Sequence, residues 1–261
     1  MLRLSLFLFL LTFILPLSAQ NDFRTGQKAW VLAKSGLNVR ERAGTGYAKT
    51  GKLKYGAEVR VLDARGEKLE IEGIPGDWVK VEIGELKGYV FDGFLSVFPP
   101  PASSEEYPPV KEWLSDFAKT LGAPRTEKKV LDEGEEWESI QNLTFQDYEG
   151  GLTYSLEEDD MSISESVFLP GAPLENAFLL GKQLDKLYKD FSLGKVEEAG
   201  SWHEEGERGN EVQYLDLETE QDSKGRRQKI HCRVHILGSY TWLIVTRQEK
   251  GSLLEMGSRA D

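Results

Sequence analysis

The stretch "GDWVKVEIGELKGYVFDGFLS", residues 76–96, alternates apolar and polar side chains on both sides of a short glycine-bearing turn. Alternation with a period of two is typical of strands with one buried face, so the stretch predicts a β-hairpin. We pair Val81 with Val90 across this hairpin, and Lys80 then lies opposite Phe91 on the other face. Four side chains are expected to build the core: Val79, Val81, Ile83 and Val90.

Further short runs with strand character precede this hairpin and are separated by turns that contain glycine. Many short strands within about 70 residues favour a small barrel or a sandwich. The runs upstream of the hairpin are "KAWVLA", "LNVR", "AEVRVLD" and "KLEIEG".

The ordered motifs of this region resemble the bacterial SH3-like domain over residues 27–98. They are "LNVR", the "GxLxxG" pattern around residues 51–56, "GDWVKV" and the closing "GYVxxxFLS". The resemblance implies an all-β SH3-like barrel that binds a peptide or a cell-wall-derived ligand. The chain departs from the family pattern at "ERAGTG" and in the longer "EGIPGD" segment, and both departures fall in loops that can line a ligand groove.

Aromatic side chains on the outer face of the hairpin are candidates for the floor of that groove, because they supply contact area at low entropic cost. By resemblance, the loop from Arg40 to Tyr47 forms the other wall. The alternative is that these aromatic residues support a neighbouring loop or a second domain. The candidate ligand-binding residues are Arg40, Tyr47, Trp78, Tyr89 and Phe91.

The two ends of this domain are marked by segments of different composition. Residues 1–19 have an early cation, a short apolar run and small residues at the end, which is typical of a secretory signal peptide. We therefore expect an exported protein, periplasmic or secreted, with no transmembrane span after cleavage. Residues 99–109 are rich in proline and are expected to be a linker.

The second half of the chain is acidic and is expected to be an α+β domain over residues 110–250. From residue 103 onward it carries 18 lysines and arginines against 33 aspartates and glutamates, which argues against nucleic-acid binding. Its pattern predicts a helix from residue 110, three strands, a second helix over 173–191, and three or four antiparallel strands. This half resembles no family that we can name.

The segment "IHCRVH", residues 230–235, contains the only cysteine and two of the three histidines. Its strict alternation predicts a strand that turns Cys232 inward, as an inert core thiol. The two histidines then share a face but lie roughly 13 Å apart, which is too far to bind one metal ion. We expect hairpins that pair Cys232 with Leu215 on one side and with Val245 on the other.

One end of this strand carries aromatic and basic side chains on its outward face. These residues are either a second binding patch or the surface beneath a helix, and we favour the helix. They are Tyr214, Arg233, His235, Tyr240 and Trp242.

Taken together, these patterns predict a binding or adaptor protein that is not an enzyme, with no catalytic residue, cofactor or metal site. Its expected partner is a peptide, a peptidoglycan-like ligand or an envelope protein. Two alternatives stay open: a cell-wall hydrolase that uses carboxylates of the second domain, and an envelope assembly partner without affinity for the wall.

Overall fold

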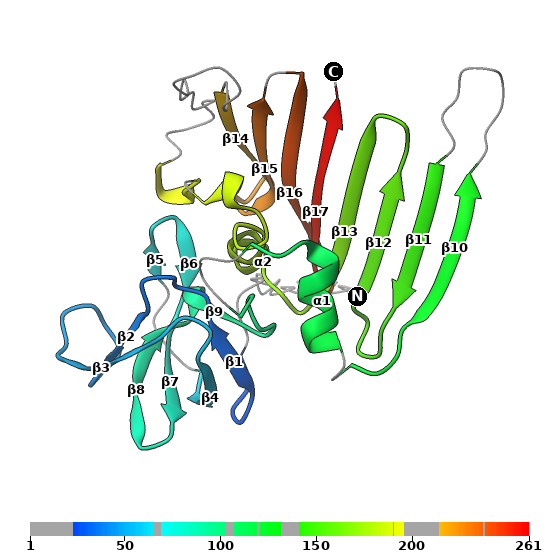
Figure 1. Cartoon of the computed structure of the whole chain (residues 1–261). Coiled ribbons are helices and arrows are strands. Elements are labelled where there is room, and N and C mark those ends of the chain that lie inside the picture. The colour runs from blue at the N-terminus through cyan, green and yellow to red at the C-terminus, as the bar shows by residue number, and fades with distance from the viewer. Residues whose placement is uncertain are drawn as a thin grey trace, which may run out of the picture.

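The computed structural model describes residues 23–64, 69–102, 107–118, 121–131, 141–189, 191–195, 214–236 and 238–260. The expected signal peptide lies outside these residues. Figure 1 shows a small barrel beside a large sheet, with helix α2 between them.

Short antiparallel strands form the N-terminal barrel, as the sequence predicts. They are β1 (Lys28–Val31), β2 (Leu37–Arg40), β3 (Lys49–Leu53), β4 (Glu58–Asp63), β7 (Trp78–Ile83), β8 (Leu86–Phe91) and β9 (Leu95–Ser96). They pair in the order β3-β2-β8-β7-β4-β1-β9, and a 3-10 turn, η1 (Asp92–Phe94), precedes β9. A separate hairpin is made by β5 (Leu69–Ile71) and β6 (Ile74–Gly76).

The central hairpin of the barrel has the predicted faces but not the predicted register. Val79, rather than Val81, lies opposite Val90, because the turn between Ile83 and Leu86 has only two residues. A shift by two residues keeps every side chain on its face. Val79, Val81 and Val90 are therefore buried in the barrel core as expected, whereas Ile83 next to the turn is 37% exposed.

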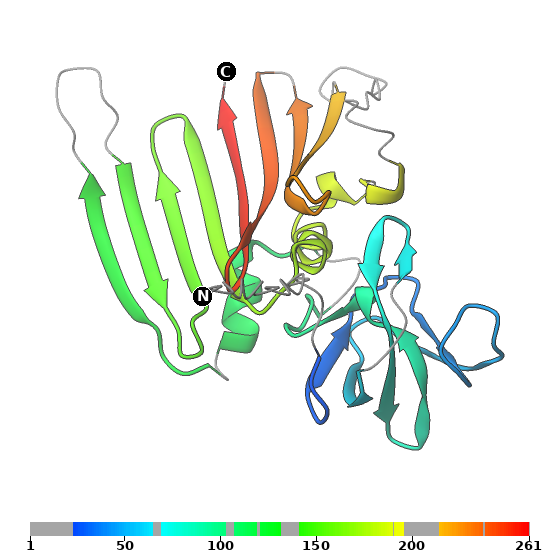
Figure 2. The same ribbon diagram turned by 180° about the vertical axis from the view of Figure 1, so that it is seen from behind.

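The second half forms one eight-stranded antiparallel sheet, with two α-helices on one of its faces (Figures 1 and 2). The strand order is β10-β11-β12-β13-β17-β16-β15-β14. Its elements are α1 (Val110–Ala118), β10 (Arg125–Leu131), β11 (Gln141–Asp147), β12 (Thr153–Glu158), β13 (Ser162–Pro170), α2 (Leu174–Gly181), η2 (Lys186–Tyr188), η3 (Leu193–Lys195), β14 (Tyr214–Gln221), β15 (Arg227–Ile236), β16 (Ser239–Gln248) and β17 (Gly251–Ala260).

This arrangement differs from the expected one in three places. A fourth strand, β10, precedes the three that were predicted, and β17 continues the sheet beyond residue 250. The second helix ends at Gly181 instead of continuing to Phe191. A Cβ at Gly181 would lie 2.6 Å from a methyl carbon of Leu243, so the helix touches the sheet closely there. The Asp185 carboxylate then accepts a hydrogen bond from the backbone N–H of Leu187 and starts a separate 3-10 turn.

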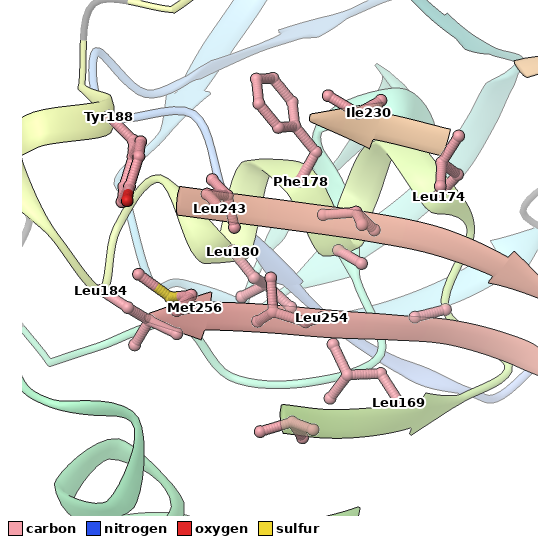
Figure 3. Close-up of a cluster of buried hydrophobic side chains, with 14 of the residues drawn as sticks. Leu169, Leu174, Phe178, Leu180, Leu184, Tyr188, Ile230, Leu243, Leu254 and Met256 are labelled. Carbon is pink, nitrogen blue, oxygen red and sulfur yellow. The ribbon is translucent and has the colours of Figure 1, made fainter. Parts of the chain in front are cut away.

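Helix α2 is buried on nearly all sides because the sheet and the barrel cover opposite faces of it. An apolar helix of this kind is typical of the inside of a protein. Leu174, Phe178 and Leu180 of the helix belong to the same apolar cluster as Ile230, Leu243 and Leu254 of the sheet (Figure 3).

Hydrogen bonds fasten the barrel to α2. The side-chain amide of Asn176 donates to the carbonyl oxygens of Gly93 (3.0 Å) and Leu95 (2.8 Å), and all three residues are buried. Gln183, just after α2, donates to the carbonyl oxygen of Leu32 (3.1 Å) and accepts from the hydroxyl of Tyr55. The two halves are therefore packed against each other.

The β5–β6 hairpin contains the "EGIPGD" departure from the family pattern, and it contacts the second half of the chain. A Cβ at Gly73, where φ is +75°, would lie 2.4 Å from the backbone nitrogen of Gly194. Arg227 of β15 donates to the carbonyl oxygen of Gly73 (2.9 Å). The hairpin thus serves as a contact between the halves.

The described part of the proline-rich segment also packs on its neighbours. The indole N–H of Trp113 in α1 donates to the carbonyl oxygen of Pro99 (2.9 Å), and the rings of Phe98 and Phe117 are 6.1 Å apart. Pro100 and Pro101 are buried. This stretch is part of the packed structure and is not a free spacer.

Candidate binding cleft

Two of the aromatic residues predicted on the outer face of the barrel hairpin are largely covered. Trp78 and Phe91 lie opposite each other in β7 and β8, with ring centroids 6.4 Å apart, and are 5% and 2% exposed. Both belong to the apolar cluster that includes α2. The second half of the chain therefore covers most of the surface of these two residues, which agrees with the alternative that they support a second domain.

The other predicted groove residues surround this covered pair. Arg40 lies on β2, and its guanidinium carbon is 5.8 Å from the ring centre of Trp78. The same guanidinium donates to the carbonyl oxygen of Tyr47 (2.6 Å), whose side chain is 45% exposed. Tyr89 pairs with Lys80, whose amine lies 5.9 Å from the Tyr89 ring centre. Arg40 therefore connects the 40–47 loop to the hairpin.

A cleft of about 570 Å³ opens where the barrel meets α2 and the segment that follows it. The structure brings Arg40, Trp78 and Phe91 together in its lining, whereas Tyr47 and Tyr89 are not part of it. Such a volume lies within the range of typical ligand-binding clefts. The second half contributes Leu179, Lys182, Gln183 and Lys189.

Sequence reasoning missed the cleft residues that come from outside the hairpin, such as Lys34, Glu72 and Lys189. Lys34 follows β1, Glu72 lies in the β5–β6 turn, and Lys189 follows η2. No local pattern marks them, because the packing of the two halves alone brings them together.

The second predicted patch lies on the sheet face turned away from the helices. The rings of His235 and Tyr240 stack with centroids 5.8 Å apart, and Tyr240 lies 5.6 Å from Trp242. Arg233 pairs with Glu218 (2.6 Å) on the neighbouring strand. For Tyr214 the structure gives only the backbone pairing with His235.

The helix that we expected over this patch is not among the described elements. Ile230, Cys232 and Val234 of β15 are buried on the face toward α2, whereas His231, Arg233 and His235 point the opposite way and are half-buried. Both described α-helices lie on the first of these faces (Figures 1 and 2).

The structure confirms Cys232 as a buried core residue. It is 0% exposed, and burial raises the pKa of its thiol far above the ordinary value. Its strand partners are Leu217 and Leu243 rather than the predicted Leu215 and Val245, which is again a shift of two residues. Burial, and then the charge of Arg233, lower the pKa of His231 and favour its neutral form.

The described residues contain neither a metal-binding group nor a helix suited to crossing a membrane. They hold no cluster of three or more His, Cys, Asp or Glu side chains placed to bind a metal ion. The helices among them are too short or too polar to cross a bilayer.

Comparisons with known proteins identify the barrel. The family model described as "Bacterial SH3 domain" matches residues 35–96. The chain is 30% identical over 112 residues to "Bacteriocin BCN5" of Clostridium perfringens, a match that covers 42% of this chain and 11% of that relative's length. No solved structure matches the chain. Residues 35–96, and with them Arg40, Trp78 and Phe91, are therefore a bacterial SH3 domain, joined in this chain to an eight-stranded antiparallel sheet.

Proposed function

We propose that this chain is an exported, non-catalytic binding protein whose bacterial SH3 barrel captures a peptide or a cell-wall-derived ligand. The observation that carries the proposal is the cleft beside the barrel hairpin, in which Arg40, Trp78 and Phe91 of a recognised wall-binding type of domain come together. Export rests on the leader-like residues 1–19.

The state of the reactive side chains supports a binding role over an enzymatic one. Cys232 is buried and keeps its proton, so it is unsuited to act as a nucleophile. Glu175, a buried carboxylate in α2, is held by Arg227 (3.4 Å) and Arg247 (3.6 Å). These groups serve packing and charge pairing.

Co-sedimentation of the mature protein with purified, insoluble peptidoglycan tests this function. We expect the protein to sediment with the wall while the supernatant gains no soluble wall fragments. Retention in the supernatant would contradict wall binding and favour an envelope protein as partner. Release of soluble fragments that rises with incubation time would instead show a wall hydrolase.

A further inference from the structure

The charge of the cleft is opposite to that of the whole protein. The chain has a formal net charge of −12. The charged residues that line the cleft are four cations and one carboxylate: Lys34, Arg40, Lys182, Lys189 and Glu72. Electrostatic complementarity at short range therefore favours an anionic group in the cleft, whereas the rest of the chain does not attract one.

The cations stand on both walls of the cleft. Lys34 is exposed, and its amine donates to the hydroxyl of Tyr107 (2.9 Å) and lies over the same ring. Arg40 lies over the ring of Trp78 on the barrel wall. Lys189 is exposed on the opposite wall, which the second half of the chain supplies.

Lys182 and Arg40 differ in the groups that their side chains contact. The amine of Lys182 donates to the carbonyl oxygen of Phe191, so we assign Lys182 to the packing of its own segment. The Arg40 guanidinium instead contacts a carbonyl oxygen and an aromatic ring. A guanidinium stacked on a ring keeps its planar fork of N–H groups in a fixed orientation and suits a carboxylate.

Between the cations the lining is apolar, with a few small polar side chains. The apolar residues include Trp78, Phe91 and Leu179, and the uncharged polar ones are Ser35, Asn38, Thr45 and Gln183. A ligand that matches this lining has small apolar groups, backbone-like donors and acceptors, and at least one negative charge.

We infer that the cleft binds a short peptide through its free carboxylate groups, with Arg40 of the barrel and Lys189 of the second half on either side. This inference rests on the proposed function and adds to it the chemistry of the ligand. It also gives the second half of the chain a direct part in binding.

Calorimetric titration of the full mature protein tests the inference. The probe is a synthetic tetrapeptide of alanine, glutamate, lysine and alanine with free carboxylates, compared with the same peptide in which every carboxyl is amidated. We expect amidation to weaken binding at least about tenfold, because charge-assisted hydrogen bonds are lost. Arg40→Gln and Lys189→Gln should each weaken binding of the free peptide about three- to tenfold and leave binding of the amidated peptide unchanged.

Two matched variants remove the same kind of charge outside the cleft. Lys49 lies opposite Arg40 in the β2–β3 ladder, and Lys186 lies three residues before Lys189. Neither is part of the lining. Lys49→Gln and Lys186→Gln should bind the free peptide within about twofold of the unmodified protein, as expected for exposed charges that do not line the cleft and act only through solvent.

The outcomes separate this inference from the proposed function. If the protein sediments with peptidoglycan but all four variants bind the free peptide equally, the inference is wrong and the function stands. If the free peptide binds in the cleft but the wall does not, the inference stands without wall binding. Displacement of the peptide by inorganic phosphate at equal concentration would show a general anion site and overturn the assignment to peptides.

Discussion

At the scale of single residues, burial decides which side chains are accessible for reaction or binding. Alternation along residues 227–236 correctly predicted that Cys232 points inward, since a period of two assigns each side chain to a face. The same rule placed Trp78 and Phe91 on the outer face of the barrel hairpin. It could not predict that α2 covers them, because that contact joins residues about 100 positions apart in the chain.

We predict that the Cys232 thiol makes the protein less stable at alkaline pH. Burial raises the pKa of the thiol in the folded protein. The unfolded chain releases that proton at about pH 8.5, as a free cysteine does. Above that pH the unfolded state binds fewer protons than the folded state, so the free energy of unfolding falls as pH rises.

Urea unfolding at pH 7 and pH 9.5 measures this effect in the unmodified protein and in Cys232→Ala. The unmodified protein should lose about 1 kcal/mol more than the variant between the two pH values. Other groups titrate in both proteins and cancel in the comparison. Equal losses, or native-state alkylation of Cys232 as fast as in the unfolded chain, would show that the thiol is accessible.

At the scale of elements, the sequence predicted on which face of a strand each side chain lies, but it did not predict the strand register or the ends of the elements. All three hairpins for which we predicted a register keep their faces but are shifted by two residues. In the β14–β15 connection the Asp222 carboxylate accepts hydrogen bonds from the backbone N–H groups of Lys224 (2.9 Å) and Arg226 (3.0 Å). This capped loop has five residues, 222–226, and a register irregularity lies beside it between Glu220 and Gln221; the two together account for the shift there.

The strand that sequence reasoning missed, β10, lies at an edge of the sheet. Its sequence, "RTEKKVL", is mostly charged, and β11 is its neighbour on one side. Charged residues are common on edge strands because they hinder pairing with other chains. The alternation that marks a half-buried strand is therefore weak in this segment.

The buried ion pairs of α2 give a prediction at this scale. Glu175 contacts Arg227 and Arg247, whose side chains are 17% and 14% exposed. Glu175→Gln leaves both guanidinium groups without that counter-charge, and the free energy of unfolding should fall by about 3 kcal/mol. Urea unfolding measures the loss.

Glu218→Gln is the matched control, because the Glu218 carboxylate also pairs with an arginine, Arg233, but is 54% exposed. An exposed pair contributes little, so this variant should lose less than about 1 kcal/mol. Equal losses in the two variants would mean that the burial of Glu175 does not matter.

At the scale of the whole molecule, the barrel and the sheet are joined through α2 and the β5–β6 hairpin. The family resemblance predicted the barrel. The segment that departs from the family pattern is the one that contacts η3, at Gly73 and Gly194. Neither this contact nor the cleft beside it has a signature in the sequence, because each depends on two distant segments meeting.

We predict that the two halves unfold together and that Asn176 couples them. Asn176→Ala leaves the carbonyl oxygens of Gly93 and Leu95 without their side-chain donor, so the protein should lose about 2–4 kcal/mol of stability. Calorimetry should show one unfolding transition for the unmodified protein and a lower, broader or split transition for the variant. Asn142→Ala, which changes an exposed residue of β11, should match the unmodified protein.

Hydrogen exchange of the full mature protein, with and without soluble peptidoglycan fragments, tests most directly that ligand binds between the two halves. Our account predicts that the fragments slow exchange both in residues 32–40 of the barrel and in residues 179–189 of the second half, since both segments line the cleft. Slower exchange confined to the barrel, or to the His235, Tyr240 and Trp242 face of the sheet, would contradict it.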